Sequence, residues 1–485
     1  MIQPLALLNI LSVVTLVFAL AMAAPLVVSY ALNDGALSAF GQGMAVTAIA
    51  GLAVRALTRG RQRELQVRDG FLLAVLGWSL LPAFGAVPLM AYLPDLSFTD
   101  AYFESVSGLT TTGATVLIGL DRLPPSINLW RCQLQWMGGM GILVLAVAIL
   151  PLLGVGGAQI FKAETPGPMK DAKLTPRIAE TAKGLWVIYA LLTALCVLAY
   201  GLAGMDWLDA VMHAFTTVSL GGYSSHDASF AHWNSVAIEA VAVSFMVVGS
   251  MNFATHFIAL RKRSLRAYAN DPEVVPFLVV LGVAVPAIAL FLWVSGTYGE
   301  AAVALRYATF NVISIATTTG FASTDYGLWP VFPQLVLLIL CCFTSSSGST
   351  GAGIKMVRAM LMVKQALQEL KRLIHPRAVL PLKLGRQVVD NRVVLAVLAF
   401  MLVYGGSVIV MTMILVATGL DVVTAFGAII ASINNMGPAL NELGPSRNFA
   451  SLTDLQTWVC AFAMLLGRLE LLTLIVVFTP TFWRK

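Results

Sequence analysis

Long uncharged stretches follow one another along this chain, and short polar segments separate them. Residues 1–33 carry no charged side chain, and the other uncharged stretches lie near 36–54, 71–93, 133–161, 184–204, 275–297 and 393–420. Two further stretches, near 235–260 and 455–482, are apolar except for Glu239, Arg468 and Glu470. An apolar run of about 18 residues is long enough to cross a bilayer as a helix. The pattern therefore predicts a helical protein that crosses the membrane many times.

Composition agrees with this prediction, because the 485 residues are 58% hydrophobic and only 11% charged, with a mean hydropathy of +0.84. A soluble protein of this length needs far more polar surface. The first apolar stretch is either a cleaved signal peptide or a retained helix. It lacks a basic start and is long enough to span, which favours a retained helix. The five cysteines lie in or beside apolar segments, which argues against disulfides and zinc sites.

The basic residues indicate the orientation in the membrane. Of the 30 Lys and Arg residues, 25 lie in 55–69, 162–183, 261–266, 355–392 and the C-terminal pair. Cytoplasmic connections are rich in Lys and Arg, so we expect these segments and both termini to be cytoplasmic. Four arginines remain for the outward loops: Arg122, Arg131, Arg306 and Arg447. The outward loops also carry most of the acids, so the outer face should attract cations.

A polar run between two apolar stretches, SGLTTTGATV at 107–116, recurs in related form. The four copies align without gaps as FESVSGLTTTGA (103–114), MHAFTTVSLGGY (212–223), FNVISIATTTGF (310–321) and GAIIASINNMGP (427–438). Each copy ends in small polar residues and a glycine, and these glycines are Gly113, Gly222, Gly320 and Gly437. Each copy also lies between two long apolar segments. Repetition at a long, regular period indicates that the fold is built from repeated units.

We therefore expect an all-α polytopic membrane protein with four pseudo-fourfold helix–pore-loop–helix repeats around one pore, preceded by two extra transmembrane helices. The expected divisions are 1–69, 70–170, 171–268, 269–385 (with a broken second helix) and 386–485. Non-helical backbone at membrane depth is tolerated only where protein buries it or water lines it. Four such loops around one axis would let backbone carbonyls replace the hydration shell of a cation. Glycine permits the positive φ angles that turn the carbonyls inward.

An acid lies near the outer end of each expected pore helix. These acids are Asp100, Asp209, Glu300 and Asp421. A carboxylate is favourable at a helix N-terminus because of the helix dipole, while the opposite, partially negative end would point at the cation. We expect helix capping rather than direct ion binding for these four residues.

The repeated segments resemble the Trk/Ktr/HKT superfamily of potassium-uptake proteins, and within it the TrkH family of bacterial membrane subunits. The resemblance covers essentially the whole chain and rests on TTTGAT (110–115), GGYSSHD (221–227), ATTTGFAST (316–324) and INNMGPAL (433–440). It implies one K⁺ selectivity filter that ends in the four aligned glycines. The K⁺-binding carbonyls would be those of Thr111, Thr112, Leu220, Gly221, Thr318, Thr319, Asn435 and Met436.

Two departures from the family pattern are visible. Copies two and four are not TTTG, so the filter is chemically asymmetric, and we expect poorer selectivity than in a tetrameric channel. Copy two has adjacent glycines, so Gly221 competes with Gly222 for the alignment, although the flanking residues favour Gly222.

The second apolar segment of the third repeat is interrupted by TSSSGSTGAGIK, residues 344–355. So many Gly, Ser and Thr residues disfavour a continuous helix. Either the small residues allow close helix packing, or the segment is a flexible loop that obstructs the pore. A phosphate-binding loop is excluded because the GxxxxGK[ST] spacing is missing. The resemblance implies a gate formed by Thr344, Ser345, Ser346, Ser347, Gly348, Ser349, Thr350, Gly351, Gly353 and Arg468.

Arg468 is a charge inside an apolar segment, which marks a functional position with a partner to be identified. One interpretation is a buried ion pair with Glu239. The interpretation we favour places Arg468 in the pore lining below the filter, hydrogen-bonded to the 344–353 loop; the family also has a basic residue there. The five histidines show no metal-binding cluster in the sequence. His226 is expected to be a solvated loop residue at the outer mouth.

The resemblance implies gated, channel-like K⁺ uptake across the bacterial inner membrane. It also implies a homodimer and a cytosolic TrkA-like ring of nucleotide-binding subunits docked on the basic linkers. This chain has no nucleotide-binding segment and needs no cofactor of its own, and we expect neither nucleic-acid binding nor enzymatic activity. A Na⁺- or H⁺-coupled cation symporter is the alternative. An intramembrane enzyme with Ser347 or Ser349 as nucleophile would need His256 or Lys355 as its base.

Overall fold

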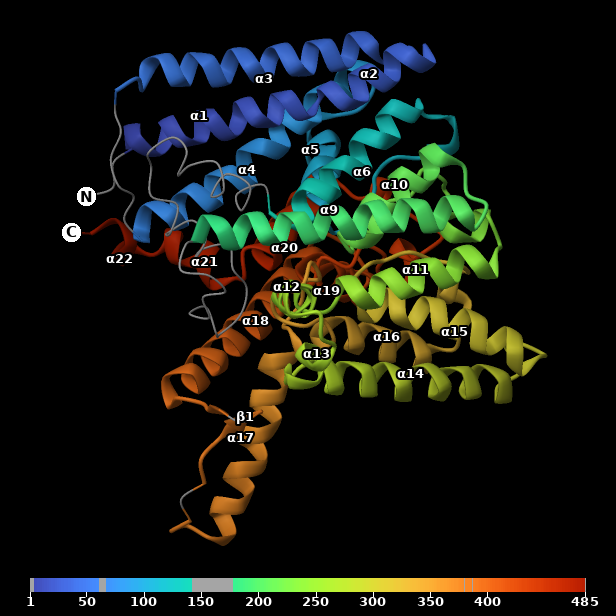
Figure 1. Cartoon of the computed structure of the whole chain (residues 1–485), viewed down its shortest axis with the longest axis vertical. Coiled ribbons are helices and arrows are strands. Elements are labelled where there is room, and N and C mark those ends of the chain that lie inside the picture. Colours follow the sequence, from blue (N-terminus) through green and yellow to red (C-terminus); the bar gives the residue numbers. More distant parts are fainter. Residues whose placement is uncertain (1–3, 61–66, 142–177, 379, 386, 485) are drawn as a thin grey trace.

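The computed structural model describes residues 4–60, 67–141, 178–378, 380–385 and 387–484 (Figure 1). The second half of the apolar stretch 133–161 and most of the basic segment 162–183 lie outside the described residues.

The described residues confirm a helical protein with many apolar spans. Six helical stretches are long and apolar enough to cross a membrane: 4–32, 37–57, 68–92, 183–202, 274–294 and 391–417. Two further candidates are sharply bent pairs of helices, at 236–262 and 454–478. These stretches agree with the positions expected from hydropathy.

Three helices precede the repeats: α1 (Pro4–Ala21), α2 (Ala23–Leu32) and α3 (Leu37–Leu57). They form two antiparallel spans, and α1 packs on both α3 and α4 (Figure 1). Asn33 and Gly35 in the turn between the spans both have positive φ. Asn and Gly adopt such angles more readily than other residues, so the sequence is compatible with this turn. The Asp34 carboxylate accepts hydrogen bonds from the Ala36 N–H and from the Ser126 N–H of the first repeat. The two extra spans are therefore attached to the repeats at a defined point.

Each repeat contains an outer helix, a short pore helix that leads into the polar run, and an inner helix. In repeat one these are α4 (Val67–Tyr92), α5 (Phe98–Leu109) and α6 (Pro125–Gly139); in repeat two, α9 (Ile178–Leu202), α10 (Trp207–Val218) and α11 (Val236–Gly249). In repeat three they are α14 (Val274–Val294), α15 (Ala301–Ala316) and α16 (Val331–Phe343); in repeat four, α18 (Asn391–Ala417), α19 (Val422–Ile433) and α20 (Asp454–Arg468).

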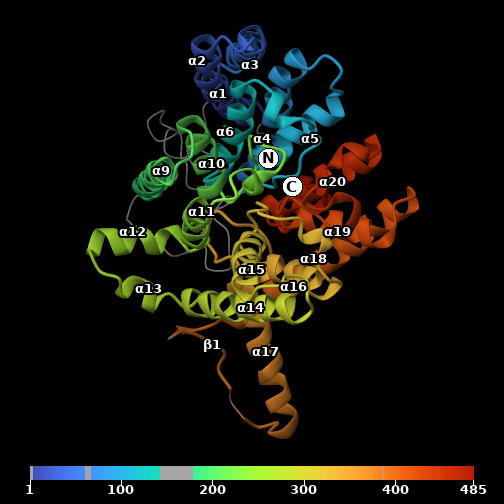
Figure 2. The same ribbon diagram turned by 90° about the vertical axis from the view of Figure 1, so that its right-hand side faces the viewer.

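The repeats are arranged in a closed ring. Within each repeat the pore helix packs against its own outer and inner helices. Between repeats, each inner helix packs on the pore helix of the next repeat: α6 on α10, α11 on α15, α16 on α19, and α20 back on α5. Figure 2 shows the repeats following one another around a common centre. This arrangement confirms the expected all-α, pseudo-fourfold fold class.

Two inner helices bend where the sequence predicts continuous spans. The chain turns by 93° between α11 and α12 (Phe253–Lys262), and by 107° between α20 and the segment Leu472–Phe478. At the first bend the Asn252 side chain caps α12 by accepting a hydrogen bond from the Ala254 N–H at 2.8 Å. At the second, α20 ends at Arg468, and Glu470 and Leu471 then take positive φ angles of +53° and +45°. Hydropathy misses both bends because each bent pair taken together is still apolar enough to pass as one span.

The third repeat continues beyond the ring. After α16 the chain passes through residues 344–355 and enters α17 (Met356–Ile374), which projects away from the other helices (Figure 1). A two-residue antiparallel pair, β1 (Lys383–Leu384) and β2 (Gln387–Val388), follows it. In the described part of the chain the remaining short elements are α13 (Arg266–Asn270), α21 (Leu472–Ile475), α22 (Pro480–Trp483), η1 (Leu120–Arg122), η3 (Ser229–His232), η4 (Tyr326–Leu328), η5 (Asn441–Leu443), η6 (Phe449–Ser451) and η7 (Val476–Phe478).

Candidate functional site

The four polar runs share one backbone conformation. In every copy the aligned glycine has positive φ: +85° at Gly113, +79° at Gly222, +90° at Gly320 and +95° at Gly437. The residue two positions earlier also has positive φ, and these residues are Thr111, Leu220, Thr318 and Asn435. Such angles are uncommon for residues other than glycine, so their recurrence in all four copies indicates one specified loop conformation.

The residue between these two positions is held in the same way in each copy. Its backbone N–H donates to the carbonyl five residues earlier, always at 2.8 Å: Thr112 to Ser107, Gly221 to Thr216, Thr319 to Ser314 and Met436 to Ala431. This bond closes the C-terminal end of each pore helix, as in a Schellman motif. Gly221 thus corresponds to Thr112, Thr319 and Met436, which supports the alignment on Gly222.

The four loops contact one another in a closed cycle. A Cβ added to Gly113 would lie less than 3.0 Å from the Gly221 carbonyl oxygen, and one added to Gly222 would collide with that of Thr319. A Cβ on Gly320 would in turn meet the Met436 oxygen.

The fourth loop closes the cycle, because a Cβ on Gly437 would lie 2.7 Å from the Thr112 oxygen of the first loop. Each glycine thus leaves room for the carbonyl that precedes the glycine of the next copy. The structure brings all twelve residues that the sequence assigns to a filter into this ring.

One loop carries an additional restraint. The Gln135 side chain of α6 donates to the Gly221 carbonyl at 2.6 Å and accepts from the Tyr223 N–H at 3.0 Å. The second copy has glycine where the others have larger residues, and Gln135 occupies the vacated space, since a Cβ on Gly221 would collide with it. The ring is therefore asymmetric in its hydrogen bonding as well as in its sequence.

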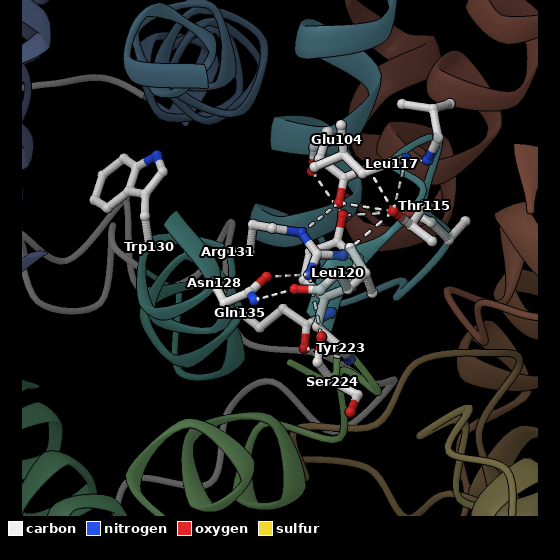
Figure 3. A network of polar contacts seen from close by, with 12 residues as sticks. Glu104, Thr115, Leu117, Leu120, Asn128, Trp130, Arg131, Gln135, Tyr223 and Ser224 are labelled. Atoms are coloured by element: carbon white, nitrogen blue, oxygen red, sulfur yellow. Dashed lines mark hydrogen bonds and ion pairs between the residues drawn. The ribbon is translucent and has the colours of Figure 1, made fainter. Parts of the chain in front are cut away.

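A buried ion pair supports the first loop (Figure 3). Glu104 of α5 and Arg131 of α6 lie 2.8 Å apart, and both side chains are fully buried. The Glu104 carboxylate accepts from the Thr115 hydroxyl and the Val116 N–H, both at 3.0 Å. Arg131 also donates to the Ser224 carbonyl in the second copy at 3.1 Å. The pair therefore connects the segments that follow the first two glycines.

Arg131 does not lie in an outward loop, so the prediction from the distribution of basic residues is wrong for this residue. The residue belongs to α6, and its guanidinium also lies 4.3 Å from the Tyr223 ring centroid. Arg306, assigned to the same class, pairs with Glu239 at 2.7 Å. Glu239 is therefore the partner of Arg306 and not of Arg468. The sequence did indicate that Arg131 needs a partner, since it is the only charged residue within the α6 segment Pro125–Gly139.

Replacing Glu104 with Gln should destabilise the protein markedly. The change leaves the Arg131 charge buried without its counter-ion, which costs about 3–5 kcal/mol in comparable cases. We expect a clearly lower temperature at which the detergent-solubilised protein loses its monodisperse peak. The matched control is Arg372→Ala, which removes an exposed pair with Glu369 and should cost only a few tenths of a kcal/mol. Equal stability of the two variants would contradict this role.

Residues 344–355 lie against the ring of loops. The Ala352 N–H donates to the Thr318 hydroxyl at 3.0 Å, and the Thr350 hydroxyl donates to the Val218 carbonyl at 3.0 Å. The end of α11 and the start of α12 hold the segment from another side, because the Ser346 N–H donates to Ser250 and the Gly348 carbonyl accepts from Phe253. The segment is thus a non-helical insert between the second and third repeats.

Arg468 connects this segment to the first repeat. Its guanidinium donates to the Thr350 carbonyl at 3.2 Å and to the Thr111 hydroxyl at 3.1 Å. It also donates to the carbonyls of Gly138 and Gly139 at the end of α6. One arginine of the fourth repeat therefore contacts a ring residue, the 344–355 segment and the first inner helix.

The proposed bases for an intramembrane enzyme are engaged elsewhere. Both ring nitrogens of His256 have partners, the Tyr268 hydroxyl at 2.9 Å and the Val248 carbonyl at 3.0 Å. The Lys355 ammonium donates to the Gly351 carbonyl. Neither residue forms a hydrogen bond with Ser347 or Ser349 in the described part of the chain.

The acids near the N-terminal ends of the pore helices differ in whether their side chains cap the helix. Asp421 caps α19 by accepting from the Val423 and Thr424 N–H groups. Glu300 occupies the N-cap position of α15 without a side-chain hydrogen bond, and Asp100 lies in a first turn that Ser97 caps. The expectation of capping therefore holds fully for Asp421.

The second pore helix differs again, because Asp206 rather than Asp209 caps α10. Asp209 instead accepts hydrogen bonds from Ser225 and His226 in the loop above. His226, expected to be a solvated loop residue, is half-buried with both ring nitrogens on carboxylates: Asp121 at 2.5 Å and Asp209 at 3.1 Å. The cluster was not predicted because Asp121 comes from another repeat and lies 105 residues before His226 in the chain.

Comparison with known proteins agrees with this geometry. The TrkH family, described as cation transport proteins, matches residues 36–485. The Trk system potassium uptake protein TrkH of Halomonas elongata is 46% identical over 479 residues, which is 99% of each chain. The protein of the same name from Escherichia coli K12 is 44% identical, also over 99% of each chain. The crystal structure of the potassium transporter TrkH from Vibrio parahaemolyticus superposes with a TM-score of 0.90 at 41% identity, covering 99% of this chain and all of that one.

Proposed function

This chain belongs to the TrkH family of cation transport proteins, and from that premise we propose that it conducts K⁺ through a gated, channel-like pore. It is a multi-pass membrane protein of potassium uptake, and it is a transporter rather than an enzyme. The four-loop filter, the gate, the regulation and the orientation described below are our proposals, as is the division into five segments at residues 69, 170, 268 and 385.

The observation that carries the filter proposal is the cycle of glycine–carbonyl contacts. A dehydrated cation needs oxygen ligands on all sides, and backbone carbonyls supply them without a charged side chain. In the proposed filter these oxygens belong to Thr111, Thr112, Leu220, Gly221, Thr318, Thr319, Asn435 and Met436. The glycines let neighbouring loops approach closely enough for the oxygens to face one ion.

We assign the gate to residues 344–353 together with Arg468. The segment contacts Thr318 of the ring, and Arg468 contacts both Thr350 and Thr111. A guanidinium at this depth repels cations, and a Gly/Ser-rich segment is easily rearranged because glycine adds little conformational restraint. Opening would require the Arg468–Thr350 hydrogen bond to break and the segment to leave the ion path.

The alternative is a cation symporter coupled to Na⁺ or H⁺. Secondary transporters commonly consist of two inverted repeats with broken helices at a midplane site. Here the four repeats follow the same order of outer, pore and inner helix, which favours a single-file pore. The membrane potential supplies about 2.3 kcal/mol per unit charge for each 100 mV, which is enough to accumulate K⁺ without a coupled ion.

Flux measurements in liposomes separate the two mechanisms. We expect purified protein to mediate K⁺ uptake driven by a membrane potential alone, with K⁺ preferred over Na⁺. Empty liposomes, and liposomes with Gly113→Ser protein, provide the controls. A strict requirement for a Na⁺ or H⁺ gradient would refute the channel-like mechanism and favour the symporter.

We further propose that the protein acts as a homodimer in the bacterial inner membrane, with both termini cytoplasmic. The cytosolic partner would be a TrkA-like ring that binds nucleotide and docks on the basic segment 355–392. Helix α17 in this segment projects from the bundle and exposes Leu367, Leu370, Leu373 and Ile374 beside its basic residues. A projecting amphipathic helix suits contact with another protein chain.

Glu273 gives the gate a dependence on pH. Its carboxylate accepts from the backbone N–H groups of Ser347 and Val357, at 2.9 and 3.0 Å, and so connects the gate segment to the first turn of α17. Burial raises the pKa of Glu273 to about 7, and its charged neighbours Asp271 and Lys355 act in opposite directions. Below this pH the neutral carboxyl is a weaker acceptor for both bonds.

Basal K⁺ flux should therefore increase about fivefold when the pH on the gate side falls from one unit above to one unit below this pKa. The change corresponds to about 1 kcal/mol, the difference between charged and neutral acceptors. The sign follows from the raised pKa: protonation begins near neutrality and not near the usual 4.5. Glu273→Gln should have high flux at both pH values, whereas the exposed Glu369→Gln should retain the response. A pH response unchanged in Glu273→Gln would exclude this residue as its origin.

A further inference from the structure

Three side chains from two repeats meet beside the first turn of α10, at what the proposed function makes the outer mouth of the pore. Asp121 lies in η1 after the first loop, His226 lies four residues after Gly222, and His232 ends η3. One ligand atom from each of the three lies within 4.8 Å of the other two. In a tetrahedral zinc site the ligand atoms are roughly 3–3.5 Å apart, so shifts of about 1 Å would close the group around one ion.

The orientation of His226 matches that of a metal ligand. Its Nε2 faces the Asp209 carboxylate at 3.1 Å, while its Nδ1 faces Asp121. Histidines that bind metals usually donate their second ring N–H to a carboxylate, which fixes the ring and increases its basicity. The second oxygen of Asp121 is itself held, because it accepts from the Asp227 N–H at 3.2 Å. Two of the three ligands are thus oriented by neighbouring groups.

His232 completes the group and is free to move. Its ring stacks on that of His226, with centroids 3.6 Å apart and planes 10° apart. Among the described residues neither nitrogen of His232 has a hydrogen-bond partner, and the residue is exposed. Two parallel rings cannot both direct their lone pairs at one ion, so His232 must tilt. Its place at the end of a short 3₁₀ turn allows this adjustment.

We propose that Asp121, His226 and His232 form a binding site for a divalent transition-metal ion, with Zn²⁺ as the best fit. Two imidazole nitrogens, one carboxylate oxygen and a water molecule make a common four-coordinate zinc site. Imidazole nitrogen favours Zn²⁺, Ni²⁺ and Cu²⁺, whereas Mg²⁺, Ca²⁺ and K⁺ prefer oxygen ligands. The site is therefore distinct from the carbonyl ring below it.

Metal binding here would connect the outer loops of the first two repeats. Both loops leave the ring directly, and Arg131 already bonds to Ser224 two residues before His226. A divalent charge at this mouth opposes the entry of cations. External Zn²⁺ should therefore slow K⁺ uptake, a consequence that rests on the proposed pore function, whereas the binding itself does not.

Zn²⁺ titration of the tag-free, full-length protein tests the site directly. Calorimetry should show one Zn²⁺ per chain, and His232→Ala or His226→Gln should weaken the affinity by about tenfold or more. Asp209→Asn, which removes the carboxylate behind His226, should also weaken it by about tenfold. His375→Ala is the matched control, because His375 is exposed at the end of α17, away from this cluster.

A second measurement uses the tryptophan beside the site. The Trp233 ring centroid lies 5.0 Å from those of both His226 and His232, so bound Cu²⁺ should quench its fluorescence. The quenched component should disappear in Trp233→Phe and require much higher Cu²⁺ concentrations in His232→Ala.

The measurements test the metal site independently of the proposed pore. Absence of Zn²⁺ binding up to millimolar concentrations, or binding weakened as much by His375→Ala as by His232→Ala, would overturn the proposal. Binding that depends on His232 supports the site, whatever the transport assay shows. Inhibition of K⁺ uptake by external Zn²⁺ that His232→Ala relieves would add support for its place at the mouth, and binding without inhibition would overturn that placement alone.

Discussion

Protein carrying Gly113→Ser should lose most of its preference for K⁺ over Na⁺. The new Cβ would lie less than 3.0 Å from the Gly221 carbonyl oxygen, which is backbone and cannot rotate away. A side chain at φ +85° adds about 1–2 kcal/mol of local strain. One or both loops must therefore shift, and at least one ion-facing oxygen is displaced. We expect the K⁺/Na⁺ flux ratio in liposomes to fall about tenfold, which corresponds to about 1.4 kcal/mol.

Gly35→Ser is the matched control for this experiment. Gly35 has the same φ of +85°, but an added Cβ there would meet no atom within 4 Å. The two variants therefore share the backbone strain and differ in the collision with the next loop. Selectivity unchanged in Gly113→Ser, or reduced equally in both variants, would mean that the ring of glycines does not form the filter.

Replacing Arg468 with Ala should increase basal K⁺ flux about tenfold or more. The residue holds Thr350 of the gate segment and places a positive charge beside the ring. A unit charge about 8 Å from the ion path raises the energy of a cation by roughly 2 kcal/mol at an effective dielectric constant of about 20. Loss of the charge and of the hydrogen bond to the gate act in the same direction.

One further variant separates the effect of the Arg468 charge from that of its hydrogen bonds, and another provides the control. Arg468→Lys keeps the charge but not the forked set of donors, so it should give an intermediate flux. Arg447→Ala removes an exposed arginine from the connection between α19 and α20 and should leave basal flux unchanged. If Arg468→Ala conducts no faster than Arg447→Ala while remaining folded, Arg468 is not part of a gate. Deletion of residues 347–349 tests the gate segment independently and should also increase basal K⁺ flux.

The features predicted best from the sequence are those that recur. The four copies could be aligned because each carries the same apolar-to-polar transition before a glycine, and the structure gives all four the same backbone angles. The interruption at 344–355 was visible because Gly, Ser and Thr stand in an otherwise apolar segment. The contact of Arg468 with this segment was also anticipated, since a charge at membrane depth requires a partner.

The features missed are contacts between residues far apart in the sequence, without a motif to connect them. Glu104 and Arg131 belong to different helices, and nothing local shows that they form a fully buried pair. Asp121 and His226 come from different repeats. Apolar composition also conceals where a span bends, although Asn252 was a recognisable helix cap within the segment 235–260. Pair contacts of this kind depend on the assembled ring, which the order of residues alone does not reveal.

The cycle of glycine–carbonyl contacts has a sense of rotation, and this affects how the protein can evolve. Each glycine makes room for a carbonyl of the following copy, never of the preceding one. A substitution at Gly113 should therefore first displace the loop of copy two, and a substitution at Gly437 should first displace the loop of copy one. Suppressor mutations should accumulate in that direction around the ring. If the copies arose by duplication, their side chains could change, but the four loop backbones had to keep conformations that fit against one another.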